Sequence, residues 1–174
     1  MQILTDYTKN VVKYDLINKF NYKVPNQLPK LKSIVLTFKV NKYDVKTLSC
    51  CLAAAELISD QKPKLTQSKV SNISLKIRKG MPVGCKITLR KKKLKHFLFK
   101  LMNKFQLTEL KIASKNKLFY SCRISNMFIF NVLEKNYQFF KNLSDLNINI
   151  STTTCKNEEL LFLLKSYKLV KKQM

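Results

Sequence analysis

The sequence predicts an α+β fold, in which a mostly antiparallel sheet has helices packed on one face and a basic, polar surface on the other. Several segments alternate Ile, Leu, Phe or Cys with Lys, Thr, Ser or Arg, a period of two that is typical of strands with one buried face. Between them lie segments with apolar residues at helical spacing. Helices that cover the dry face of such a sheet form a two-layer architecture. The length of 174 residues, 45% of them hydrophobic, suits a single domain that spans 1–174.

Five segments are expected to be strands. The clearest is 31–40, where apolar side chains occupy every second position. Segments 73–78 and 85–90 show the same alternation and are expected to pair as a hairpin. Segments 124–130 and 146–151 complete the predicted set.

Four helices are expected, at 4–20, 45–59, 91–105 and from Asn157 onward. Asp44 and Asn157 are residue types that accept hydrogen bonds from the first amides of a helix, so each is a candidate N-cap. Segment 91–105 has the clearest amphipathic pattern, with lysines on the face opposite its leucines and phenylalanines. In the first helix the predicted apolar stripe consists of Tyr7, Val11, Tyr14 and Ile17.

The charge balance is the strongest functional signal. Lys and Arg number 34 against 10 acidic residues, which gives a net charge of +24. Such an excess disfavours the compact state through self-repulsion unless a polyanion neutralises it. An AT-rich genome alone would explain 31 lysines beside three arginines, but it would not explain so few acidic residues.

Nucleic acid is the expected polyanion, and no membrane is expected as a partner. No apolar run approaches the ~18 residues that a membrane span requires. The predicted strands place their polar side chains on one sheet face, where lysines neutralise phosphates and threonine hydroxyls contact phosphate or sugar. This face is expected to gather Thr37, Lys39, Lys86, Thr88 and Arg90.

The composition excludes several kinds of site, and neither a cofactor nor a metal is expected. Two glycines, Gly80 and Gly84, are too few for a dinucleotide-binding or P-loop motif, and His96 is the only histidine. The cysteines form no CxxC pair, so free thiols in a reducing compartment are expected. They are Cys50, Cys51, Cys85, Cys122 and Cys155.

The segment 76–84 is expected to be a basic loop with a defined backbone shape. Both glycines of the chain and Pro82 fall within it, beside three cations. Such a loop suits contact with a phosphate backbone. Its residues include Lys76, Arg78, Lys79, Gly80, Met81, Pro82 and Gly84.

Six short motifs occur in a fixed order along nearly the whole chain. They are Gln27-Leu28-Pro29-Lys30, Ala53-Ala54-Ala55-Glu56-Leu57, Gln61-Lys62-Pro63, Lys76-Ile77-Arg78-Lys79-Gly80 with Pro82-Val83-Gly84-Cys85-Lys86, Thr88-Leu89-Arg90, and Ile150-Ser151-Thr152-Thr153-Thr154. With these motifs the chain resembles the family of large-subunit ribosomal protein five, in its bacterial and organellar form.

The resemblance implies a structural protein of the large subunit's central protuberance, without enzymatic activity. Its expected partners are 5S rRNA, large-subunit rRNA, the P-site tRNA and a small-subunit head protein across an intersubunit bridge. The basic loop 74–84 would face the tRNA elbow. The rRNA-binding residues would be Thr37, Lys39, Gln61, Lys62, Lys86, Thr88 and Arg90.

The chain departs from the family at two places. The family usually has Asn at the position of Thr37, followed by a Gly-Val-Gly that here reads Lys39-Val40-Asn41. The glycine-rich segment that helps to form the bridge is missing or shortened between 105 and 120.

The expected location is the mitochondrial matrix, in a mitochondrial ribosome. The lysine-over-arginine bias and a start at the family's own N-terminus both favour an organelle-encoded protein, and the cytoplasm of an AT-rich bacterium is the alternative. Two functions outside the ribosome stay open on the residues alone. One is general nucleic-acid binding, including DNA compaction, and the other is RNA modification, for which the sequence offers neither a metal cluster nor a second histidine.

Overall fold

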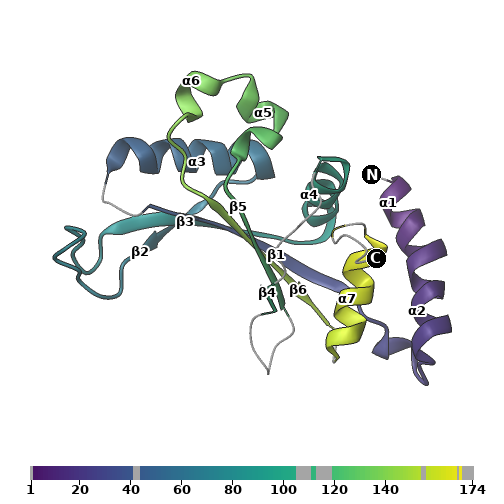
Figure 1. Ribbon diagram of the computed structural model, residues 1–174. Helices are drawn as coiled ribbons and strands as arrows, with labels where there is room; N and C mark the ends of the chain where they lie inside the picture. The colour runs from purple at the N-terminus through teal and green to yellow at the C-terminus, as the bar shows by residue number, and fades with distance from the viewer. Residues whose placement is uncertain are drawn as a thin grey trace. The chain divides into compact units, whose positions relative to one another are not determined.

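Six strands form a sheet in the order β2-β3-β1-β6-β5-β4, and the computed structural model confirms an α+β fold with a mostly antiparallel sheet (Figure 1). The structure describes residues 2–40, 44–104, 111–112, 119–153, 156–167 and 169. The strands are β1 Leu31–Lys39, β2 Lys64–Gln67, β3 Pro82–Leu89, β4 Lys111–Ile112, β5 Phe119–Ile124 and β6 Leu146–Thr152.

The chain divides into two compact units. The first comprises residues 1–34, 90–122 and 149–174, and the second comprises residues 35–89 and 123–148. The expectation of a single domain stays a prediction. The helices are α1 Gln2–Tyr7, α2 Lys13–Phe20, α3 Val45–Ser59, α4 Lys91–Lys104, α5 Asn131–Glu134, α6 Tyr137–Phe140 and α7 Asn157–Ser166.

Burial alternates along the strands, which confirms that one face of the sheet is dry. The side chains between the buried ones are exposed or half-buried, as the period of two requires. The buried strand residues include Ile34, Leu36, Phe38, Cys85, Ile87, Leu89, Tyr120, Cys122, Ile124, Leu146, Ile148 and Ile150.

In the first unit, α1 and α2 are joined by a π-turn at Thr8–Val12 into one continuous helical segment. The segment buries Leu4, Val12 and Leu16, and the Tyr7 hydroxyl donates to the Ser166 carbonyl of α7 at 2.9 Å. Leu4, Val12 and Leu16 are spaced by multiples of four residues, and at 3.6 residues per turn such positions gradually rotate away from one face of an α-helix. The wider π-turn offsets this rotation and keeps the three side chains on one face.

The predicted stripe of this helix is therefore wrong. Val11 and Tyr14 are exposed, by 40% and 57% respectively, and Tyr7 and Ile17 are half-buried. The inserted π-turn changes which residues share a face, and a regular helical period does not foresee it.

In the second unit, α3 packs against β3 and also contacts α5 and α6. Asp44 caps α3 as predicted, since its carboxylate accepts hydrogen bonds from the amides of Lys46 and Thr47 at 3.1 and 3.4 Å. The helix ends at Ser59, where Asp60 takes a left-handed conformation with φ +54°. Both predicted limits of this helix are confirmed.

The predicted hairpin exists, but its first strand is β2 and not segment 73–78. β2 pairs antiparallel with β3, with Lys64 opposite Lys86 and Leu65 opposite Cys85. Segment 72–77 instead folds back on itself through two backbone hydrogen bonds between Asn72 and Ile77. Of the three alternating apolar side chains there, Ile77 is buried, whereas Ile73 is 95% exposed and Leu75 is 38% exposed.

The strand predicted at 124–130 is also wrong. β5 ends at Ile124, and the Asn126 side chain accepts a hydrogen bond from the Phe128 amide at 3.1 Å. This local bond begins a 3-10 turn over Met127–Ile129. Asn157 is likewise the first residue of α7, and not its N-cap.

Pro82 and Gly84 belong to β3, and not to the loop in which the sequence analysis placed them. Gly84 is needed there for close approach, because a Cβ atom at this position would lie 2.2 Å from the Phe38 carbonyl oxygen. Gly80 is the glycine that serves the loop, with φ +90°.

We expect Gly84→Ala to lower the free energy of unfolding by about 1–3 kcal/mol, because a methyl group here forces β1 and β3 apart. Urea denaturation followed by circular dichroism measures the change. Lys86→Ala, at an exposed position on the same strand, is the control and should change stability by less than about 0.5 kcal/mol. Equal stability of the two variants would show that the strands have room for a side chain at Gly84.

Candidate nucleic-acid interface

The candidate interface is the open side of β1, β2 and β3 in the second unit. A hydrogen bond from the Val40 amide to the Val83 carbonyl, at 2.9 Å, joins β1 to β3, and the missing side chain at Gly84 allows their close approach. The side chains that alternate with the buried ones therefore share one surface. Lysines on this surface are exposed and threonines are half-buried. We call it the polar face, and it consists of Thr37, Lys39, Lys64, Thr66, Lys86 and Thr88.

The structure brings together four of the predicted face residues and adds two that the sequence analysis missed. Lys64 lies opposite Lys86 and Thr66 lies opposite Gly84 in the antiparallel register, and residues directly opposite share a sheet face. They were missed because the partner strand of the hairpin was expected at 73–78. Arg90 follows β3, is exposed and belongs to the first unit.

Gln61 and Lys62 occupy a fixed turn between α3 and β2. The Ser59 hydroxyl donates to the Ala55 carbonyl at 2.7 Å and accepts from the Gln61 amide at 3.3 Å. Gln61 is half-buried and Lys62 is exposed. The turn thus holds one amide side chain and one cation at the start of β2.

The loop between β2 and β3 covers residues 68–81, and we call it the hairpin loop (Figure 1). The amide of Ser68 donates to Met81 at 2.8 Å, and the amide of Gly80 donates back to Ser68 at 2.9 Å. These bonds and the Asn72–Ile77 bridge make the loop an ordered extension of the hairpin.

The predicted loop cations lie in the hairpin loop and are exposed. Lys76 takes a left-handed conformation with φ +55°, and Arg78 and Lys79 follow it. Met81 is half-buried and accepts a hydrogen bond from the Arg78 amide on its sulfur at 3.4 Å. The exposed apolar residues beside these cations were not predicted, although Val70 and Ile73 stand out in a basic, polar segment.

Among the residues that the structure describes, the cations of the polar face and the hairpin loop lack acidic partners. Within the described ranges, no carboxylate forms an ion pair with Lys39, Lys64 or Lys86, or with the loop cations. Lys64 and Lys86 face each other across two strands, an arrangement that is destabilising for like charges. A polyanion on this surface relieves that repulsion.

The described residues offer few groups suited to catalysis. Groups of three or more potential metal ligands are absent from the part of the chain that the structure describes. Burial raises the pKa of the Cys85 and Cys122 thiols to about 12, so neither is a nucleophile near neutral pH. Free thiols are confirmed for Cys50, Cys51, Cys85 and Cys122, while Cys155 lies outside the described residues.

No helix among the described residues combines the length and the apolar character that crossing a bilayer demands. The exposed lysines and half-buried threonines of the polar face suit it to binding a polyanion through phosphate neutralisation and hydroxyl contacts.

Comparison with known proteins gives full-length relatives of one kind. No family model matches the chain. A protein of Blochmanniella floridana, described as large ribosomal subunit protein uL5, is 34% identical, and the match covers 97% of this chain and 92% of that protein. The uL5 protein of Wigglesworthia glossinidia brevipalpis is 37% identical over 96% of this chain and 97% of its own length. The uL5 protein of Nitrosomonas europaea is 32% identical, with 97% of each chain covered.

Proposed function

This chain belongs to the uL5 family of large ribosomal subunit proteins, and we propose that its polar face binds 5S rRNA and large-subunit rRNA in the central protuberance. Members of this family are structural, non-enzymatic constituents of the large subunit, so the chain is a ribosomal protein and acts in translation. Its partners therefore lie within the ribosome. The alternative of an RNA-modifying enzyme is wrong.

The geometry of the polar face is the observation that supports rRNA binding there. Six side chains from three neighbouring strands form a surface of lysines and threonines above a buried core. A-form RNA presents phosphates and 2′-hydroxyls on its surface. Lysine ammonium groups and threonine hydroxyl groups can bind both. The turn at Gln61 and Lys62, which leads into β2, adds to the same proposal.

We expect binding to a 5S rRNA transcript to be steeply salt-dependent. With about six to ten phosphate contacts, affinity should fall by roughly 10³–10⁵ between 50 and 200 mM salt. Replacing Lys39, Lys64 and Lys86 together by Ser should reduce the salt slope by about 0.9 for each phosphate contact that is lost. Filter binding across a salt series measures both quantities.

The matched control replaces Lys23, Lys135 and Lys141 by Ser, which removes the same charge at exposed positions outside the polar face. We expect this control to retain most of the affinity. If both triple variants lose the same affinity, binding depends on net charge alone. The assignment to the polar face would then be wrong.

We further propose that the hairpin loop contacts the P-site tRNA. The support is its exposure, its three neighbouring cations and its ordered backbone. Lys76 lies in the turn that the Asn72–Ile77 bridge closes, and Arg78 and Lys79 follow on the segment that leads into β3. A loop held by its own hydrogen bonds presents these cations with little loss of conformational entropy on binding.

We expect the triple variant Lys76→Ala, Arg78→Ala and Lys79→Ala to assemble into large subunits but to release P-site tRNA about tenfold faster, because phosphate contacts are lost. The controls are ribosomes that carry Ala at the exposed residues Lys23, Lys135 and Lys141. Dissociation of labelled tRNA from purified ribosomes measures the rate. An unchanged rate of tRNA release from the assembled variant ribosomes would contradict the proposed role.

We also propose that the chain contributes to an intersubunit bridge with a small-subunit head protein. Family membership is the support. The altered segment expected to affect this contact, 105–120, lies largely outside the described residues.

The named relatives are bacterial proteins, so this is a bacterial-type uL5. We propose a mitochondrial ribosome as its location, which rests on the ratio of 31 lysines to three arginines. The bacterial relatives favour the alternative, the cytoplasm of an AT-rich bacterium. Recovery of the protein with ribosomes from purified mitochondria would support the first location, and its absence from them would overturn it.

A further inference from the structure

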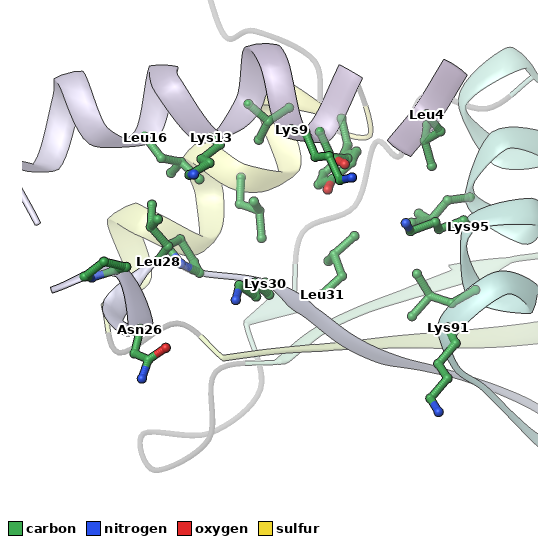
Figure 2. A pocket seen from close by; sticks show the side chains of 18 residues that line it. Leu4, Lys9, Lys13, Leu16, Asn26, Leu28, Lys30, Leu31, Lys91 and Lys95 are labelled. Atoms are coloured by element: carbon green, nitrogen blue, oxygen red, sulfur yellow. The ribbon is translucent and has the colours of Figure 1, made fainter. Parts of the chain in front are cut away.

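The first unit contains a cavity of about 480 Å³ that the rRNA and tRNA proposals do not use. Elements far apart in the sequence line it: the helical segment of α1 and α2, residues 25–31, α4 and α7 (Figure 2). Its volume falls within the range of about 300–1,000 Å³ that is usual for ligand pockets.

The inner wall of the cavity is apolar. The side chains that form it are themselves buried, while exposed residues surround them, so the cavity opens to the surface above an apolar floor. An apolar recess of this kind favours an occupant with aliphatic groups. The wall consists of Leu4, Val12, Leu16, Leu28, Leu94, Leu98, Leu163 and Tyr167.

The rim of the cavity is cationic. Lys9 and Lys13 stand on the helical segment on one side, and Lys95 reaches from α4 on the other (Figure 2). Lys30 and Lys91 also belong to the lining, and no acidic residue does among the described residues. The occupant should therefore carry several negative charges in addition to apolar groups.

We propose that this cavity binds an acidic peptide segment of another protein, with aliphatic side chains inserted between the rim lysines. Charge complementarity selects a peptide over a fatty acid, because a single carboxylate matches only one of five lysines on separate elements. The lining also disfavours a nucleobase. Tyr167 is its only aromatic residue among those described, whereas bases are bound by stacking and by hydrogen bonds to their edges.

A recess of this size binds only a short segment, so the affinity is modest. Small interfaces are typical of weak or composite contacts. The segment would gain strength from its attachment within the same particle, where the effective concentration is high.

The first test uses the isolated full chain and a short fluorescein-labelled peptide of alternating Glu pairs and Leu pairs. Fluorescence anisotropy should show saturable binding, and a peptide with Ser in place of every Leu should bind about tenfold more weakly or less. Equal binding of the two peptides would overturn the proposal, because it would show attraction by charge alone. Stronger binding of laurate than of the peptide would overturn it in favour of a lipid.

The variants separate the rim from the wall. Lys9→Glu with Lys13→Glu should weaken the Leu peptide about tenfold or more, while Lys23→Glu with Lys165→Glu, an equal charge change outside the lining, should not. Thr8→Phe adds a ring to the half-buried lining without changing the charge, and it should also weaken binding. Circular dichroism confirms that each variant is folded. Unchanged binding by the Thr8 variant, or equal loss in both lysine pairs, would contradict the assignment.

The second test identifies the occupant in the intact large subunit. A photo-crosslinking side chain at Asn26, an exposed residue of the lining, should form a crosslink to a protein segment rich in Asp and Glu. A crosslink to rRNA or to a second copy of this chain would overturn the proposal. The peptide titration does not involve rRNA, so its failure leaves the rRNA proposal intact.

Discussion

The backbone of β3 at Gly84 lies so close to the Phe38 carbonyl that a single methyl group would not fit between the strands. The missing side chain lets β1 lie close to β3, and the hydrogen bond from the Val40 amide to the Val83 carbonyl joins the two segments. This arrangement decides which side chains stand next to each other on the open surface. Because side chains alternate across a strand, the burial of Phe38 and Cys85 places Lys39 and Lys86 on the opposite side. The dry core and the basic surface are thus two results of one strand arrangement.

That arrangement has an electrostatic consequence. The chain carries a net charge of +24, and the paired strands β2 and β3 place Lys64 directly opposite Lys86, neither of which forms an ion pair with a carboxylate among the described residues. Like charges at this spacing repel each other, and the repulsion disappears when phosphates lie over them. The rim lysines of the cavity in the first unit also repel one another, and a negatively charged ligand would relieve that repulsion. There the apolar wall favours contact with aliphatic groups, so an acidic peptide with aliphatic side chains suits that surface better than RNA does.

Much of this fold is predictable from local patterns in the sequence, and the failures have definite causes. The limits of α3 follow from Asp44 as a cap and from the apolar spacing up to Ser59. The alternation in β1 and β3 predicts the residues that these strands contribute to the polar face. It does not predict Lys64 and Thr66, because β2 has only four residues and its Leu65 is 54% exposed, so β2 shows no buried apolar period. Its pairing depends on register with β3, which is a long-range property. The π-turn at Thr8–Val12 and the hydrogen bond that the Phe128 amide donates to the Asn126 side chain likewise override regular periods.

Chemical protection of the polar face tests the central claim most directly. Intact large subunits and the free protein are treated with an amine-acetylating reagent, and acetylation of Lys39, Lys64 and Lys86 is quantified by mass spectrometry. The account predicts that these three lysines react in the free protein, are protected in the subunit, and react again after ribonuclease digestion. Equal reactivity in the free protein and in the subunit, or protection that survives ribonuclease, would contradict the claim that rRNA covers this surface.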